Sequence, residues 1–333
     1  MMVRRRFPLV MAVAGLLTAL VVLWAPTVGS TPISLARVFD PALDWQANVD
    51  AQIFFVARLP RVLAGALVGA ALAAAGVVLQ ALLRNPLATP FTLGVSSGAA
   101  LGAMLATAFR LEATLLGISA VPLASFAGSM LATAIVYALA ASQRRGLSTN
   151  VLLLAGVTLN AFFSALILFV QYLANFADMF RAMRWLMGNL DVAGFGPVLG
   201  ALPLVLLAFV AFAWLARPLN LLSLGADAAG ARGLNVTAAQ RVAFFSGSIA
   251  TGAAVSVGGP IGFVGIIVPH LVRLMVGADH RLVLPASTFL GAGFLVACDV
   301  AARTVLAPVE LPVGIITAMV GGPFFLWMLI KKR

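Results

Sequence analysis

Charged residues are scarce in this chain. Of its 333 residues, 9% are Asp, Glu, Lys or Arg and 62% are hydrophobic, whereas a soluble domain carries about 25% charged residues. So few charges cannot cover a water-exposed surface, which excludes a soluble protein. The apolar runs are about 15–25 residues long, as bilayer-spanning helices are, and lack the ~10-residue alternation of a β-barrel. The sequence therefore predicts an all-α integral membrane protein with a single domain over residues 1–333.

Residues that bind metals or perform catalysis are also few. The one cysteine, Cys298, excludes a disulfide framework and a thiolate metal cluster. The two histidines, His270 and His280, fall near the same end of one apolar run, so we expect neither to be a metal or haem ligand. The sequence has no G-x-x-x-x-G-K-S/T phosphate-binding loop and no evident nucleophile–base arrangement. We therefore expect no enzyme, no metal and no cofactor in this chain.

Ten apolar runs follow one another along the chain. The first, Phe7–Trp24, comes after Arg4-Arg5-Arg6 and resembles the basic start and apolar core of a signal peptide. We interpret it as a membrane span, because many similar runs follow and no clear cleavage site ends it. The other predicted spans are Arg58–Leu83, Phe91–Phe109, Val121–Ala141, Leu147–Tyr172, Gly196–Ala216, Val242–Val257, Ile261–Val276, Leu282–Ala307 and Val313–Ile330.

The basic residues indicate the orientation of these spans. An even number of spans that starts in the cytoplasm leaves both termini cytoplasmic. Fourteen of the 21 basic residues, Arg144 and Arg145 among them, then lie on the cytoplasmic side and seven on the other, in agreement with the positive-inside rule. Of the ten acidic residues only Asp227 and Asp279 lie on the cytoplasmic side. The net charge of +11 is thus a consequence of topology, and we expect no nucleic-acid partner.

Between the sixth and seventh spans, residues 219–241 are small and polar. Ser223 and Asp227 can each begin a helix, because their side-chain oxygens can accept a hydrogen bond from a free backbone N–H. We therefore expect two short helices outside the membrane, presented to a soluble ATPase; this stretch is called the coupling segment below. The residues expected to contact the ATPase are Leu224, Gly225, Asp227, Ala228, Gly233 and Leu234.

Two polar clusters lie at the predicted cytoplasmic ends of spans. Pro86 and Pro90 forbid a continuous helix after Arg84, and Ser148-Thr149-Asn150 begins the fifth span on the same side. A constriction could form where the clusters meet, with an ordinary rigid turn as the alternative. The residues of this predicted gate are Asn85, Leu87, Thr149 and Asn150.

The fifth span offers candidates for the lining of a pathway. Asn160, Ser164 and Gln171 share roughly one helix face, and the outer loop that follows carries Trp185 and Met187. Polar residues also hold membrane helices together by hydrogen bonding, so that alternative stays open. Small residues at Gly65-xxx-Gly69, Gly94-xxx-Gly98 and Gly98-xxx-Gly102 predict closely packed helices.

Three arginines on the outer side require an explanation, since the positive-inside rule disfavours them there. Arg58 and Arg61 lie at the outer start of the second span, and Arg303 lies near the outer end of the ninth. One explanation is structural: Arg303 pairs with Asp299 four residues earlier, and the other two extend to lipid headgroups. The other is recognition of carboxylates on a partner by the planar guanidinium.

Several motifs together resemble one family, the permeases of binding-protein-dependent iron–siderophore, haem and cobalamin ABC importers. The matching motifs are Gly76-Val-Val-Leu-Gln80, Arg84-Asn-Pro-Leu-Ala88, Leu93-Gly-Val-Ser-Ser-Gly98, Leu221-Leu-Ser-Leu-Gly225, Leu234-Asn-Val236, Gly259-Pro-Ile-Gly-Phe-Val-Gly265, Val268-Pro-His270, Asp279-His-Arg281, Glu310-Leu-Pro-Val-Gly314 and Gly322-Pro-Phe324. They extend over essentially the whole chain.

The resemblance implies a type II ABC importer permease in the bacterial inner membrane. It implies a second permease subunit, expected to be an identical chain, two cytoplasmic ATPases that bind ATP and Mg²⁺, and a periplasmic or lipid-anchored binding protein. Residues 219–241 would be the coupling segment, and the predicted gate matches the family's gate. Arg58, Arg61 and Arg303 match the arginines that receive glutamates from the binding protein.

The substrate stays open at this point. An iron complex, either a siderophore or haem, is our first expectation, and cobalamin is the alternative. A secondary transporter or channel would usually need ionisable residues at the centres of its spans, which are nearly absent here. A membrane enzyme would need a catalytic cluster.

Overall fold

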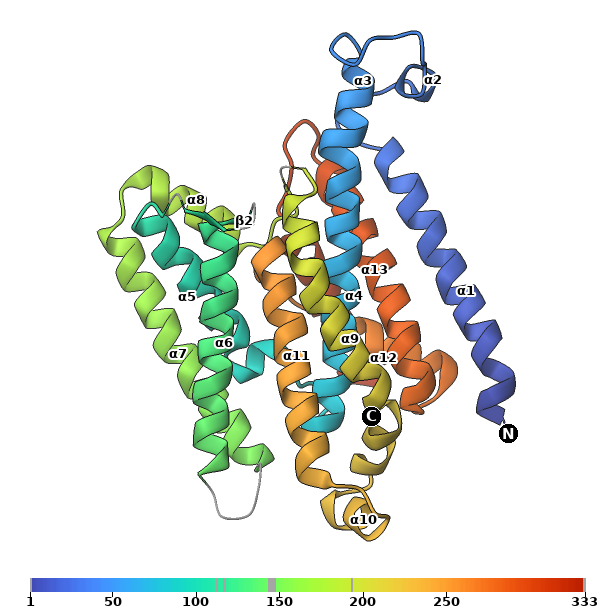
Figure 1. Ribbon diagram of the computed structural model, residues 1–333, viewed down its shortest axis with the longest axis vertical. Helices are drawn as coiled ribbons and strands as arrows, with labels where there is room; N and C mark the ends of the chain where they lie inside the picture. The colour runs from blue at the N-terminus through green and yellow to red at the C-terminus, as the bar shows by residue number, and fades with distance from the viewer. Residues whose placement is uncertain (1, 112, 116–117, 143–147, 193, 332–333) are drawn as a thin grey trace.

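The computed structural model describes residues 2–111, 113–115, 118–142, 148–192 and 194–331. Over these residues the secondary structure is helical apart from one short antiparallel hairpin, in which β1 (Thr114–Leu115) pairs with β2 (Ile118–Ser119), and loops join the helices (Figure 1). This confirms the all-α prediction. Arg144, Arg145 and the predicted start of the fifth span at Leu147 lie outside the described residues, as do Lys332 and Arg333.

The helices follow the predicted apolar runs, with different ends. Their bounds are α1 Met2–Trp24, α2 Leu35–Val38, α3 Val49–Gln52, α4 Leu59–Leu83, α5 Val95–Ala108, α6 Ala120–Ala141, α7 Thr149–Leu173, α8 Phe176–Leu186, α9 Gly196–Leu222, α10 Ala226–Ala231, α11 Val236–Gly258, α12 Val264–Val276, α13 His280–Thr304 and α14 Val313–Lys331. Short 3-10 helices cover Ala25–Thr27 and Pro90–Leu93, and a π-helical segment, Ile53–Arg58, joins α3 to α4.

By length and composition, six helical segments of the described chain could cross a membrane. They are Phe7–Thr27, Val49–Leu83, Ala120–Ala141, Thr149–Leu173, Gly196–Leu222 and His280–Thr304. Three apolar helices are shorter: Val95–Ala108, Val264–Val276 and Val313–Met328. The count of ten spans therefore stays a prediction.

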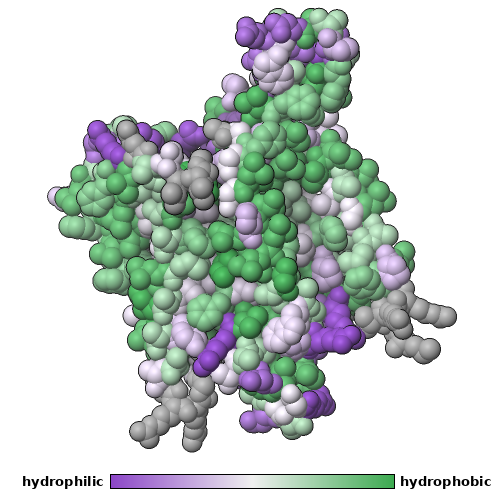
Figure 2. Space-filling model, viewed as in Figure 1, coloured by the Kyte–Doolittle hydropathy of each residue, from purple (hydrophilic) through white to green (hydrophobic). Residues whose placement is uncertain are grey.

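The surface is apolar in the middle of the long axis and polar at its two ends. Figure 2 shows a broad hydrophobic zone across the middle of the molecule, with hydrophilic residues gathered at its two ends. Figure 1 places α10 at one end and α2 and α3 at the opposite end. Both chain termini lie in the half that contains α10 (Figure 1). The termini thus share one half of the molecule; which side faces the cytoplasm stays a prediction.

Helix α4 forms the centre of the fold, because small residues let its neighbours approach its backbone. A Cβ added to Gly69 would lie 2.2 Å from the carbonyl oxygen of Gly291 in α13. A Cβ on Gly76 would lie 2.0 Å from the carbonyl oxygen of Gly265 in α12. Within lipid, such close van der Waals contact replaces the hydrophobic effect as the force between helices.

A second close contact joins α5 and α6. A Cβ on Gly98 would lie 2.5 Å from the carbonyl oxygen of Gly128, and one on Gly102 would lie 2.1 Å from that of Ala124. The close packing predicted at Gly98 and Gly102 is therefore confirmed. Gly94 differs, because it precedes α5 with φ of 79° and supplies a left-handed turn.

Replacing Gly76 with alanine should destabilise the protein, because the new methyl group has no space beside Gly265. Forced overpacking of this kind costs about 1–3 kcal/mol. The matched control is Gly15→Ala in α1, where an added Cβ meets nothing within 4 Å. Thermal unfolding in detergent measures both variants. Equal melting temperatures for the two variants would contradict this close packing of α4 against α12.

Candidate functional site

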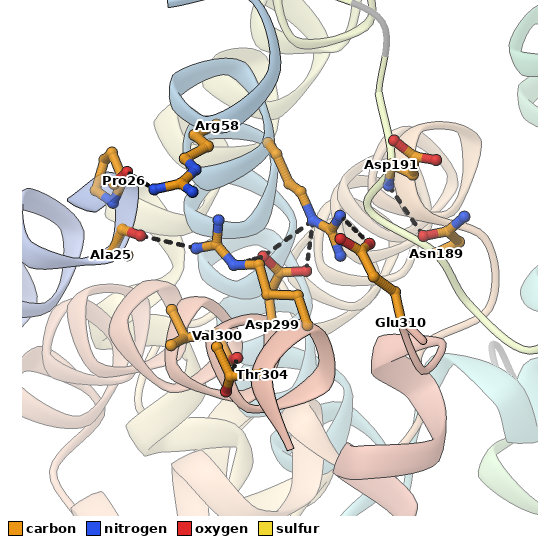
Figure 3. A network of polar contacts seen from close by, with 11 residues as sticks. Ala25, Pro26, Arg58, Asn189, Asp191, Asp299, Val300, Thr304 and Glu310 are labelled. Carbon is orange, nitrogen blue, oxygen red and sulfur yellow. Dashed lines mark hydrogen bonds and ion pairs between the residues drawn. The ribbon is translucent and has the colours of Figure 1, made fainter. Parts of the chain in front are cut away.

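The three outer arginines come together in one buried cluster, shown in Figure 3. Arg58 and Arg61 lie on the segment that leads into and begins α4, and Arg303 lies in the last turn of α13. Their exposed fractions are 6%, 8% and 3%, respectively. The alternative in which Arg58 and Arg61 extend to lipid headgroups is therefore wrong, because both side chains are buried in the protein.

Asp299 is the centre of this arginine cluster. The Nε of Arg61 donates to both Asp299 carboxylate oxygens, at 2.9 and 3.2 Å. The Nε of Arg303 lies 3.5 Å from Oδ2 of Asp299, which is an ion-pair distance. The predicted pairing of Arg303 with Asp299 is thus confirmed as an ion pair, although Asp299 accepts its side-chain hydrogen bonds from Arg61. Asp299 is 1% exposed, so two cations compensate its buried charge.

Glu310 supplies a second carboxylate that sequence reasoning missed. The Nη1 of Arg61 donates to Oε2 of Glu310 at 2.6 Å. Glu310 lies in the loop between α13 and α14, and its side chain is 40% exposed. The two residues are 249 positions apart, so no local pattern links them. The available signal was the Arg61 charge itself, which needs an anionic partner wherever it is buried.

Arg58 differs from the other two arginines, because it donates to backbone carbonyls and to no carboxylate of the described residues. Its guanidinium donates to the oxygen of Pro26 at 3.1 Å and to that of Thr31. The Nη2 of Arg303 likewise donates to the oxygen of Ala25 at 2.9 Å. The segment after α1 therefore helps to hold the cluster in place (Figure 3).

A cavity of about 330 Å³ opens beside the arginine cluster. Arg58, Arg61 and Arg303 all contribute to its wall, together with Gly29, Ser30, Thr31, Ile53, Ala57, Asp191 and Glu310. The structure thus brings the three predicted arginines together around one polar cavity. Guanidinium groups in such a place can receive a carboxylate with two parallel hydrogen bonds.

The coupling segment at the opposite end has a different local structure from the one predicted. Helix α9 continues through Pro218 to Leu222, and Ser223 ends it instead of beginning a helix. A single short helix, α10, follows Gly225, whose φ is 105°. Asn235 then begins α11 by accepting a hydrogen bond from the N–H of Ala238 at 3.0 Å. The helix predicted to begin at Ser223 is therefore absent, and the one predicted at Asp227 is α10, which begins at Ala226 without a cap from the Asp227 side chain.

The predicted contact residues lie on the outside of this segment. Leu224, Asp227, Ala228 and Gly233 are exposed, whereas Gly225 and Leu234 are partly buried. Ala229 is fully buried and anchors α10 against the rest of the protein. The segment therefore presents a small, fixed surface at the end of the molecule (Figure 1).

Asn220 fastens the base of the coupling segment to α13. Its side-chain N–H donates to Asp279 at 2.8 Å, and its side-chain oxygen accepts from the N–H of His280 at 2.9 Å. Hydrogen bonds donated by Arg281 and then by Asn220 hold the pKa of Asp279 well below its usual range. Sequence reasoning missed Asn220, since nothing local indicates that α9 ends beside α13.

Of the predicted gate residues, Asn85 and Leu87 lie in the turn after α4, whereas Thr149 and Asn150 begin α7. Arg84 ends α4 in the left-handed region with φ of 49°. The side-chain oxygen of Asn85 accepts a hydrogen bond from the N–H of Leu87 at 2.9 Å. Leu87 and Asn150 are exposed, whereas Asn85 and Thr149 are partly buried. The rigid turn is therefore present, and the gate stays a prediction.

Among the predicted pathway residues of α7, Asn160 differs from Ser164 and Gln171 because it forms hydrogen bonds to a neighbouring segment. Asn160 accepts a hydrogen bond from the hydroxyl of Ser97 at 2.6 Å and donates to the carbonyl of Phe91. It therefore ties α7 to the start of α5, as the structural alternative expected. Ser164 is exposed and Gln171 is partly buried.

Trp185 and Met187 lie near the end of α8 and are partly buried. Met187 lines a shallow hollow of about 530 Å³ together with Leu186, Pro260, Gly314, Ile315, Ala318 and Met319. For Ser164, Gln171, Trp185 and Met187, a pathway role stays a prediction.

Comparisons with known proteins agree with one another. A sequence model of the FecCD transport family matches residues 16–331. The hemin transport system permease protein of Yersinia pestis is 39% identical over 209 residues, which are 63% of this chain and 62% of that protein. The vitamin B12 import system permease protein of Escherichia coli is 40% identical over 232 residues, 67% of this chain and 69% of that protein. The chain thus spans less than two thirds of the hemin relative in this alignment.

One solved structure is similar over nearly the whole chain. It is described as an inward-facing conformation of a metal-chelate type ABC transporter, and it is 32% identical. The TM-score is 0.81, and the match covers 98% of this chain and 99% of that one.

Proposed function

Because the chain belongs to the FecCD transport family, we propose that it is the membrane-spanning permease of a metal-chelate type ABC importer in the bacterial inner membrane. The observation that carries this proposal is the whole-chain structural match to a transporter of that type. In this proposal a second copy of the chain completes the permease, and two ATPase subunits bind ATP and Mg²⁺. An external binding protein, periplasmic or lipid-anchored, delivers the substrate, and membrane lipid surrounds the apolar zone.

For the substrate we propose an iron complex, either haem or a siderophore, with cobalamin as the alternative. The similarity to the hemin and vitamin B12 permeases is nearly equal, at 39% and 40% identity. The ligand therefore has to be identified directly. Mass spectrometry of the ligand retained by the binding protein that co-purifies with this chain would distinguish haem, siderophore and cobalamin.

Co-purification tests the function itself. The tagged chain, expressed in its native membrane and solubilised in mild detergent, should retain an ATPase subunit with stoichiometry of about one per permease. A secondary transporter or channel would be isolated without an ATPase. Substrate uptake that requires a sodium or proton gradient and proceeds without ATP would overturn the proposal.

The arginine cluster is the proposed docking site for the binding protein, and a change at Arg58 tests it most directly. Arg58→Glu should weaken binding of the binding protein by tenfold or more, about 1.4 kcal/mol, because a repulsive carboxylate would face the incoming one. Arg58 donates to backbone carbonyls, so the change leaves the Arg61–Asp299 pair intact. Binding to the permease in nanodiscs is measured by surface plasmon resonance at low and high salt.

The matched control for Arg58→Glu is Arg37→Glu, an exposed arginine in α2 at the same end of the molecule (Figure 1). It should change the affinity only slightly, through long-range charge. Equal losses for the two variants would indicate a general charge effect and contradict a specific docking site at Arg58.

The gate proposal predicts cross-links that depend on nucleotide. Cysteines at Leu87 and Asn150, both exposed positions, should form a disulfide within or between permease copies in one nucleotide state. Cys298→Ala removes the native thiol, which is buried. Each single-cysteine variant serves as the control. Cross-linking of equal yield with and without ATP would identify the two segments as plain turns.

A further inference from the structure

An apolar groove runs between α5 and α7, away from the arginine cluster and the coupling segment. Its volume is about 530 Å³. Apolar side chains of α5 and α7 form its walls, among them Leu101, Leu105, Phe169, Val170 and Leu173. Helix α7 is one of the helices long and apolar enough to cross a membrane, so the groove lies where acyl chains are the surrounding solvent.

Polar residues stand at one end of this groove. Arg110, Asn175 and Asp178 complete its lining. The carboxylate of Asp178 accepts hydrogen bonds from the side chains of Asn175 and Arg181, and it lies 3.5 Å from Nη2 of Arg110. Figure 1 shows that α8, which carries Asp178 and Arg181, covers this end of α5 and α7 on the side of the molecule opposite α10.

Asp178 holds Arg110 and Arg181 in place but does not use all of their N–H donors. The Asp178 side chain is 7% exposed, whereas those of Arg110 and Arg181 are 69% and 67% exposed. Two guanidinium groups therefore share one buried carboxylate, which leaves a positive charge and several N–H donors facing outward. Asp178 positions these donors beside the mouth of an apolar groove.

The neighbouring surface of α8 is that of a helix at a membrane interface. Phe176 and Phe180 are exposed, one turn apart, on the same helix as Arg181. Aromatic and basic side chains gather at the level of lipid headgroups. In Figure 2, hydrophilic residues cap the region of α8, and hydrophobic residues cover the flank below it.

We propose that this groove binds an acyl chain of an anionic phospholipid whose phosphate pairs with Arg110 and Arg181. The chemistry of the mouth selects the headgroup: a phosphate with a net negative charge accepts donors from both arginines. The apolar walls take the chain, each buried methylene adding to the affinity. The proposal requires only that the chain is embedded in a membrane, and it is independent of what the protein transports.

Native mass spectrometry of the detergent-purified protein, mixed with equal amounts of phosphatidylglycerol and phosphatidylcholine of the same chain length, tests this site. Phosphatidylglycerol should be retained about fivefold over phosphatidylcholine, since two arginines act against one aspartate. The Arg110→Gln, Arg181→Gln variant should lose this preference. Leu105→Trp, which fills the groove, should lower retention of both lipids. Arg37→Gln, at an exposed arginine remote from the groove, is the control and should retain the preference.

Three outcomes would overturn the proposal. The first is equal retention of the two lipids by the unaltered protein. The second is a preference for phosphatidylglycerol that survives the loss of both arginines. The third is a loss of the dimer in Leu105→Trp with lipid retention unchanged, which would assign the groove to a second copy of the chain.

Discussion

A protein in which Gly225-Ala226-Asp227 is replaced by a flexible Gly-Ser linker should insert into the membrane normally and fail to transport. The replacement removes the φ of 105° at Gly225 and the first turn of α10. Helix α10 then loses its fixed position relative to α9, although Asn220 still joins α9 to Asp279. The surface proposed to contact the ATPase is disordered as a result.

We expect a large loss of stimulated ATP hydrolysis, because the coupling free energy between two sites depends on defined contacts between them. Coupling free energies of about 1–3 kcal/mol correspond to changes of about 5–150-fold. Stimulation of ATP hydrolysis by the loaded binding protein should fall by this factor, to the basal rate, in reconstituted proteoliposomes. The same linker in place of Ala42-Leu43-Asp44, an exposed loop at the other end of the molecule, is the control. Normal stimulation in the Gly225 variant would contradict the role of the coupling segment.

Replacing Asp299 with alanine should destabilise the fold strongly, by more than the Gly76→Ala change. Asp299 receives two hydrogen bonds from Arg61 and lies beside Arg303. Its loss leaves Arg303 buried without its anion and leaves Arg61 with Glu310 alone. Removing one partner of a buried ion pair costs about 3–5 kcal/mol, so we expect little folded protein in detergent and a much lower melting temperature.

A matched set of variants separates charge from packing at this position. Asp44→Ala, at an exposed aspartate, should leave the melting temperature unchanged. Asp299→Asn keeps the shape and removes the charge, so it should retain only part of the stability. A melting temperature for Asp299→Ala within experimental error of the unaltered protein would show that the arginine cluster does not need its central anion.

The sequence predicted most of the long helices, because apolar runs of membrane length are a strong signal. Their ends were harder to predict where local and tertiary effects disagree. The sixth span was predicted to end at Ala216, yet α9 continues through Pro218 to Leu222. Leu219 and Leu222 are buried against the rest of the protein, and this packing extends the helix through the proline.

Helix α8 was missed although its signals were present. Asn175 caps it by accepting the N–H of Asp178 at 2.9 Å, and Ala182 lies on its buried face. Both features follow from an N-cap residue followed by a helical period. The outer loop was instead interpreted as a connection because its polar residues interrupt an apolar chain.

The arginine cluster shows the limit of sequence reasoning most clearly. The three outer arginines stood out in the sequence because the positive-inside rule disfavours them there, and the four-residue spacing predicted the Arg303–Asp299 pair. The link from Arg61 to Asp299 spans 238 positions, and only the packing of α4 against α13 creates it. The carbonyls of Pro26 and Thr31 lie beside Arg58 because of the path that the chain takes after α1.

The backbone contacts at the glycines restrict how this molecule can change shape. Helix α4 touches α13 at Gly69 and α12 at Gly76 without intervening side chains, so sliding any one of them would drive backbone into backbone. These three helices must move as a rigid body, and α5 with α6 forms another for the same reason at Gly98. The chain passes from one body to the other through residues 84–94, where Arg84 and Gly94 both have positive φ. This turn joins the two bodies, and shear between them requires only that side chains repack.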